Sequence, residues 1–228
     1  MNKYKFLSQY TLSDSKVIRV KKFNDAIIPE YWKRIFEAKT FENKKAILLS
    51  EWKQILASEL SNTIAYLETY LKGIEFIQVD KEFYMVYTIL SYQTEKTLYY
   101  VGGNPMSSTL NASSFLLKQW NDLPNPLRAF YEKLHDGFYY YPSRSMGLDE
   151  TSEVEDFTDF ELSEGKLKPF NESETYNFFS TGMGGYVAID FTNKNKIQTI
   201  VWLNGEDVLT TLNFWDAVDE FYIMGFDE

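Results

Sequence analysis

The acidic run from Asp149 to Glu164 is the stretch of the sequence that gathers the most residues able to do chemistry. It reads DETSEVEDFTDFELSE. Carboxylates at this density could coordinate calcium or supply the carboxylate pair of a glycoside hydrolase. The run lacks the D-x-[DN]-x-[DN]-G spacing of a calcium loop, and a carboxylate pair is defined by distances that a sequence does not give. Three interpretations stay open: a solvated loop, a face for a basic protein partner, and a metal or catalytic site.

If this run is a binding face, its carboxylates steer a basic partner toward the protein and its aromatic residues anchor the contact. Two phenylalanines lie within the run and are the candidate anchors. The candidate protein-binding residues are therefore Asp149, Glu150, Glu153, Glu155, Asp156, Phe157, Asp159, Phe160 and Glu161.

Other catalytic patterns are missing from the sequence. His135 is the one histidine, and cysteine is absent, which excludes a His-rich or thiolate metal site. We expect a structural role for His135 at the end of a helix. The G-x-S-x-G, P-loop and H-E-x-x-H motifs do not occur, and Gly182–Gly185 (GMGG) lacks the spacing of a dinucleotide fingerprint. We predict a protein that is not an enzyme, with no catalytic residues, no metal and no cofactor.

Charge is unevenly distributed along the 228 residues. Residues 1–110 contain 15 Lys and Arg against 12 Asp and Glu, whereas residues 111–228 contain 8 against 21. The acidic second half would repel phosphates, so nucleic acid is not an expected partner, and a partner with a basic surface is favoured. A soluble acidic surface without a partner is the alternative. The N-terminus has no apolar core of signal-peptide length, no apolar run is long enough to span a membrane, and cysteine is absent; we expect a cytoplasmic protein.

In the first half, helical periodicity gives way to strand periodicity. A strand is expected at 16–23, a helix after Pro29, and a long helical region over about 43–72 that 61–63 can divide in two. Three strands follow at 74–79, 83–92 and 97–101. The turn-rich stretch 102–108 is the best candidate for a domain junction, which divides the chain into 1–110 and 111–228. Nothing in the first region indicates its role.

The second half is expected to begin with helices and to continue with a meander. Ser113 or Ser114 caps a helix ending near Trp120, and the stretch 123–137, LPNPLRAFYEKLHDG, forms an amphipathic helix that Gly137 ends. Strands follow at 138–141, 176–180, 186–192 and 197–203, and a helix at 213–224 closes the chain. We therefore predict an α+β fold, with an antiparallel meander packed against helices after an α+β region of helices and three strands.

The order of these elements resembles the SUKH superfamily, which includes the fungal Smi/Knr-type cell-wall regulators and many bacterial immunity proteins. The resembling residues are Leu123-Pro124, Phe130-Tyr131 through Asp136-Gly137, 178–185 (FFSTGMGG) leading into 187–190 (VAID), and Asn213-Phe214-Trp215. The resemblance covers roughly 113–228. The long acidic segment 143–175 and the early Pro126 depart from the pattern.

The resemblance implies a binding module without catalysis. In bacteria such domains typically neutralise a cognate polymorphic toxin, often a nuclease, by binding and occluding it. The leading hypothesis is thus an immunity protein whose partner is a toxin with a basic surface. The alternative is an intracellular regulatory or scaffolding protein of the Smi/Knr type that docks partner proteins.

Overall fold

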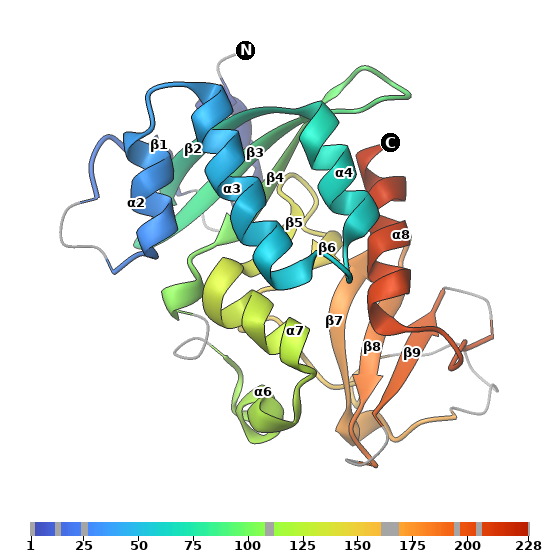
Figure 1. Ribbon diagram of the computed structural model, residues 1–228. Coiled ribbons are helices and arrows are strands. Elements are labelled where there is room, and N and C mark those ends of the chain that lie inside the picture. The colour runs from blue at the N-terminus through green and yellow to red at the C-terminus, as the bar shows by residue number, and fades with distance from the viewer. Residues whose placement is uncertain are drawn as a thin grey trace.

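A single antiparallel sheet of nine strands, in the order β1 to β9 along the chain, forms the centre of the protein (Figure 1). The computed structural model describes residues 3–11, 15–23, 27–107, 112–160, 169–193, 197–203 and 207–227. The strands are β1 (Val17–Arg19), β2 (Leu71–Val79), β3 (Glu82–Leu90), β4 (Thr97–Gly103), β5 (Asp136–Tyr140), β6 (Met146–Leu148), β7 (Thr175–Thr181), β8 (Tyr186–Asp190) and β9 (Gln198–Trp202).

Most helices lie on one face of this sheet, the near face in Figure 1. They are α2 (Glu30–Glu37), α3 (Phe41–Leu56), α4 (Ser61–Tyr70), α7 (Asn125–Ala129) and α8 (Phe214–Phe226), with α6 (Ser114–Gln119) preceding α7. The short α1 (Lys3–Leu7) lies on the opposite face. The predicted α+β class, with a meander packed against helices, is confirmed.

Local sequence signals set the ends of several helices. Pro29 precedes α2, and the side-chain oxygen of Thr40 accepts a hydrogen bond from the N–H of Asn43 to open α3. Ser113 opens α6 in the same way, with 3.1 Å between its Oγ and the N–H nitrogen of Leu116. Asn213 caps α8 by accepting from Trp215 and Asp216. These caps lie where the sequence predicted them for α6 and α8.

The sheet does not break at the predicted domain junction. Strand β4, from the first half, pairs with β5, from the second, and Val101 lies opposite Tyr139. The main core also runs through both halves, since the ring of Trp52 on α3 packs against that of Phe138 at 5.1 Å. Asp219 on α8 accepts the N–H groups of Asn62 and Thr63 at 3.0 and 2.8 Å and so caps the first turn of α4. The regions 1–110 and 111–228 therefore share one sheet and one core.

The helix predicted over 123–137 ends earlier than expected. After α7, Phe130–Leu134 forms a π-helical turn (η4), and His135 is already extended. Gly137 does have a positive φ of 76°, but it lies inside β5 and does not end the helix. A side chain at this position would collide with the backbone of Glu150, 2.8 Å from a Cβ atom. Gly137 thus lets the chain after β6 lie directly against β5.

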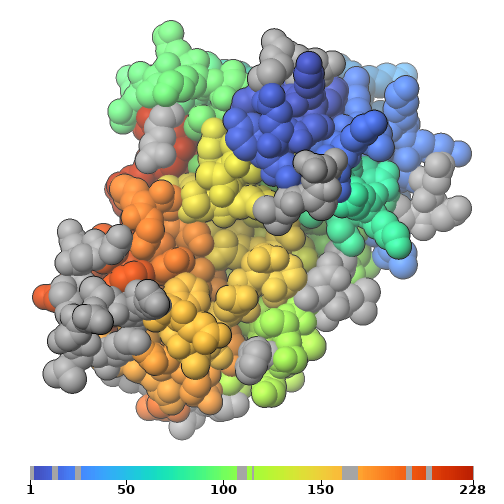
Figure 2. Space-filling model, turned by 180° about the vertical axis from the view of Figure 1, so that it is seen from behind, coloured from blue at the N-terminus to red at the C-terminus, as the bar shows by residue number. Residues whose placement is uncertain are grey.

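Two smaller clusters cover the opposite face of the sheet, shown in Figure 2. At one end α1 inserts Leu7 against apolar residues of β1 to β5. At the other end Phe157 packs with Phe170, Ala188 and Ile200 against β8 and β9. The segment that follows β6 therefore lies on the back of the sheet, where the candidate site is found.

Candidate functional site

The acidic segment borders a pocket of about 380 Å³ on the back of the sheet. Strand β6 leads directly into it, because Asp149 and Glu150 follow Leu148, the last residue of that strand. The pocket is lined by Tyr139, Ser143, Arg144, Asp149, Glu150, Glu153, Phe160, Asn177, Ser180 and Tyr186. Its volume lies within the range of pockets that bind small molecules or single side chains.

Asp149 is fixed at the base of this pocket by β7. The side-chain nitrogen of Asn177 donates to its Oδ2 at 2.9 Å, and the Ser180 hydroxyl donates to the same atom at 3.2 Å. Its backbone N–H donates to the carbonyl of Phe178 at 3.0 Å. Burial raises the pKa of the Asp149 carboxyl well above its usual range, and the two side-chain donors oppose this shift without cancelling it.

Glu150 lies beside Asp149 and has a different donor. The Tyr139 hydroxyl donates to its Oε1 at 2.5 Å. Burial raises the pKa of Glu150, while the Tyr139 hydrogen bond and the positive charge of Arg144 lower it. The guanidinium of Arg144 stacks over the Tyr139 ring, 5.4 Å from its centroid, and Arg144 has a φ of 55°. Among the residues that the structure describes, no cation forms an ion pair with Asp149 or Glu150.

A third carboxyl group, that of Asp136, lies next to Glu150 on the side facing β3 and β4. Its Oδ1 accepts the N–H of Thr151 at 2.9 Å. Burial raises the pKa of Asp136 from 3.8 to about 7, and the negative charge of Glu150 adds to this shift. Asp136 and Glu150 both line a narrow cavity of about 20 Å³, room for roughly one water molecule, together with Glu82 and Tyr84. Three carboxyl groups with raised pKa values are therefore held close to one another.

The structure divides the predicted protein-binding residues by exposure. Glu153, Glu155 and Asp159 are exposed, and Asp149, Glu150, Asp156 and Phe160 are partly buried. Asp156 accepts the N–H of Thr158 at 2.9 Å, which makes a local turn. Glu161 lies outside the described residues. Among the described residues of the run, Glu153, Glu155 and Asp159 are the exposed carboxylates that can act as a steering face in the predicted sense. The partly buried carboxyl groups of Asp149 and Glu150 line the pocket, to which Glu153 also contributes.

The expectation that Phe157 anchors a partner is corrected. Phe157 has no exposed surface, and its ring lies 4.7 Å from that of Phe160, 5.5 Å from Phe170 and 5.9 Å from Tyr186. Its backbone N–H also donates to the carbonyls of Glu172 and Thr175. Phe157 therefore anchors the acidic segment to the sheet, which places Phe160 and Tyr186 as the aromatic wall of the pocket.

Several residues of the pocket were not among the predicted site residues, namely Tyr139, Ser143, Arg144, Asn177, Ser180 and Tyr186. They lie on β5, β7, β8 and the turn after β5, and the three-residue β6 brings them together. Strand β6 pairs Gly147 with Ser180 and Leu148 with Phe179, so the next residue, Asp149, faces Asn177 and Ser180. A sequence pattern could reveal these residues only if it first identified β6.

His135 has the structural role expected of it, by a different contact. The ring is fully buried, with Nε2 2.7 Å from the Tyr87 hydroxyl and Nδ1 3.3 Å from the carbonyl oxygen of Gly103. Trp52 donates to the same Tyr87 oxygen at 2.9 Å. Burial lowers the pKa of His135 to about 3, so the ring is neutral at pH 7, donating from Nδ1 and accepting at Nε2. The ring joins α3, β3 and β4 in the core.

Two further classes of site were sought in the described part of the chain. No group of three or more His, Asp or Glu side chains there is arranged to hold a metal ion. No helix within the same ranges has the length and apolar character needed to cross a bilayer.

The chain was also compared with models of known protein families, with curated proteins and with solved structures, and none of the three comparisons found a match.

Proposed function

We propose that this protein is a non-catalytic protein-binding module whose acidic pocket receives a basic side chain of its partner. The observation that carries the proposal is the pair Asp149 and Glu150, two carboxyl groups in the lining of one pocket, neither of which forms an ion pair with a described residue. The charge of Arg144 in the same lining acts on Glu150 from a longer distance. We further propose that the partner is a toxin and that the protein acts as its immunity protein. The resemblance of residues 113–228 to the SUKH pattern supports this second step.

A cationic side chain would relieve an unfavourable feature of the pocket. Burial disfavours the ionised forms of Asp149 and Glu150, which is why their pKa values are raised; the charge of Arg144, in the same lining, opposes the shift of Glu150 without cancelling it. A guanidinium or ammonium group in the pocket favours the ionised forms and forms charge-assisted hydrogen bonds with them. The rings of Phe160 and Tyr186, 5.0 Å apart in an edge-to-face arrangement, offer an aromatic surface to the same cation.

The exposed carboxylates near the pocket would act before contact is made. Glu153, Glu155 and Asp159 belong to the same segment as the pocket carboxyls and point into solvent. Negative charges around a binding site accelerate the approach of a positively charged partner, and salt weakens this effect. We assign these residues to steering, and Asp149 and Glu150 to the contact itself.

The mechanism would be occlusion without chemistry. A toxin that acts on nucleic acid needs a basic groove to bind phosphates. An acidic pocket that captures an arginine or lysine of such a groove would keep the substrate out.

The steering role predicts a change in association rate. The variant E153Q/E155Q/D159N should associate several-fold more slowly at low salt with the toxin candidate encoded beside this protein's gene. The dependence of the association rate constant on ionic strength should become flatter, because three charges of the steering field are gone. Stopped-flow or surface-binding kinetics at several salt concentrations measure both quantities.

The matched control is E30Q/E37Q/E42Q, which removes three exposed carboxylates from the first half of the chain. It should leave the rate and its salt dependence close to those of the unmodified protein. Equal rates for the two triple variants would remove the acidic segment from the interface. A toxin candidate that neither binds this protein nor loses its toxicity in its presence would contradict the immunity role.

A further inference from the structure

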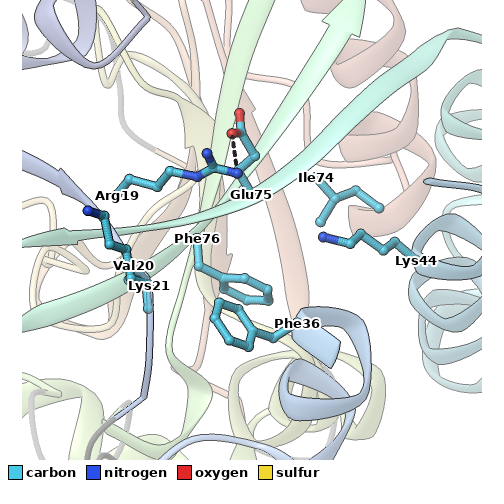
Figure 3. Close-up of a pocket in the computed structure, with 8 residues that line it drawn as sticks. All are labelled: Arg19, Val20, Lys21, Phe36, Lys44, Ile74, Glu75 and Phe76. Carbon is cyan, nitrogen blue, oxygen red and sulfur yellow. Dashed lines mark ion pairs between the residues drawn. The ribbon is translucent and has the colours of Figure 1, made fainter. Parts of the chain in front are cut away.

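A second pocket, far along the sheet from the acidic one, lies between the edge of the sheet and helices α2 and α3 (Figure 3). Its volume is about 330 Å³, and it is lined by Arg19, Val20, Lys21, Phe36, Lys44, Ile74, Glu75 and Phe76. The proposed binding of a basic partner uses none of these residues. Because the chemical character of this pocket is opposite to that of the acidic one, it calls for a different ligand.

The inner part of the pocket is apolar and aromatic. Phe36 on α2 and Phe76 on β2 are in edge-to-face contact with ring centroids 6.1 Å apart, and Figure 3 shows the two rings side by side at its centre. Phe23 packs against both rings, at 5.1 and 5.2 Å, and fixes them from behind. Val20 and Ile74 complete the apolar lining. A flat or aliphatic group could therefore be buried there.

Cations border this apolar interior. Arg19, Lys21 and Lys44 contribute three positive charges, and Lys44 is partly buried, with its ammonium directed toward the pocket in Figure 3. None of the ion pairs among the described residues involves Lys21 or Lys44. A partly buried ammonium without a counter-ion is unfavourable, and an anion beside it would offset that cost.

The one carboxylate in the lining is already engaged elsewhere. Glu75 forms an ion pair with Lys3 and accepts the Tyr4 hydroxyl at 2.7 Å. Arg19 lies 3.6 Å from the same carboxylate, the ion pair marked in Figure 3. These three partners lower the pKa of Glu75 against the opposing effect of burial, so it is ionised and satisfied by its own contacts. The lysines of the pocket remain available to an anion from solution.

We propose that this pocket binds a small organic anion, a phosphate or carboxylate attached to an aromatic or aliphatic body. The body would lie against the rings of Phe36 and Phe76 and the side chain of Ile74, and the anionic group would meet Lys44. Neither half of such a ligand suffices alone, since the pocket offers an apolar interior and a cationic mouth together. This site is independent of the acidic pocket and gives the first half of the chain a binding role.

Phenyl phosphate, inorganic phosphate and phenol separate the two contributions. In a titration followed by ¹H–¹⁵N NMR, phenyl phosphate should shift the amide signals of Val20, Phe36, Ile74 and Phe76 in a saturable way. Inorganic phosphate and phenol should each bind at least tenfold more weakly. Benzoate in place of phenyl phosphate shows whether a carboxylate serves as well, and binding of either anion supports the proposal.

The variant K44Q tests the cationic half of the site. It should weaken phenyl phosphate binding about tenfold and leave the weak response to phenol unchanged. The control K133Q removes an exposed lysine from the second half and should have no effect. No saturable shift with phenyl phosphate or benzoate, equal binding by K44Q, or equal binding of inorganic phosphate and phenyl phosphate would each overturn the proposal.

Discussion

The double variant D149N/E150Q is expected to lose the basic partner and to become more stable at alkaline pH. Both carboxyls have pKa values raised by burial, so the folded state holds their protons more tightly than the unfolded chain does. The stability of the unmodified protein therefore falls as pH rises from the ordinary carboxyl pKa through these raised values, and the amide variant escapes that loss. We expect the free energy of unfolding to rise by on the order of 1 kcal/mol at pH 8 and partner affinity to fall at least tenfold.

Urea denaturation and a binding titration on the same samples check the two effects together. The variant E37Q/E42Q removes the same charge from exposed positions and should change neither quantity appreciably. A double variant that binds the partner normally would exclude the pocket as the contact. A variant that both loses binding and unfolds more easily would instead indicate that the two carboxyls support the fold.

Asp136 carries the second large expected effect, on stability alone. Its pKa in the folded protein is about 7 against a usual 3.8. At about 1.4 kcal/mol per pKa unit, ionising Asp136 costs on the order of 4 kcal/mol above pH 7, a cost that disappears below about pH 4, where both states are protonated. The variant D136N should recover about half of it, because the amide oxygen can still accept the Thr151 N–H while the amide nitrogen gains no assigned acceptor.

Unfolding midpoints in urea at pH 4 and pH 8 measure this effect. D136N should be more stable than the unmodified protein by about 2 kcal/mol at pH 8. It should be less stable by a similar amount at pH 4, where the unmodified protein regains the full cost of about 4 kcal/mol and the variant, which does not titrate, gains nothing. The exposed Asp159 provides the control, since D159N removes the same charge where burial imposes no cost. A D136N protein that is less stable at pH 8 would mean that the ionised carboxylate stabilises the fold.

The periodicity of the sequence predicted the elements of this fold well where amphipathic patterns are long. Trp52 and Leu56 recur with helical spacing on α3, and the chain before β8 turns through GMGG, where Gly182 and Gly184 have φ values of 79° and 76°. Strand β6 was not predicted, because three residues, one of them glycine, carry no alternation. The pairing of β4 with β5 was not predicted either, since more than thirty residues, α6 and α7 among them, separate these strands.

The candidate site shows the same division between local and long-range information. The sequence located the acidic segment, and Asp149, Glu150, Glu153 and Phe160 do line a pocket. The sequence did not show which of the two phenylalanines is buried, because Phe157 and Phe160 have similar acidic neighbours. The fold shows that Phe157 is fully buried. The hydrogen-bond partner Asn177 of Asp149 lies on β7. The sequence predicted a strand there, after the acidic segment, but not which of its residues lie beside Asp149.

The most direct test of the acidic pocket uses an arginine side chain without the rest of a partner. N-acetyl-arginine methylamide should bind several-fold more tightly at pH 8 than at pH 5, because binding favours the ionised carboxyls and releases protons at the lower pH. Calorimetric titrations in buffers of different ionisation enthalpy measure the affinity and the number of protons released. The neutral citrulline analogue is titrated in the same way as the control. The account predicts pH-dependent binding of the arginine compound and none of the citrulline compound. Equal binding of both, or arginine binding that does not change with pH, would contradict it.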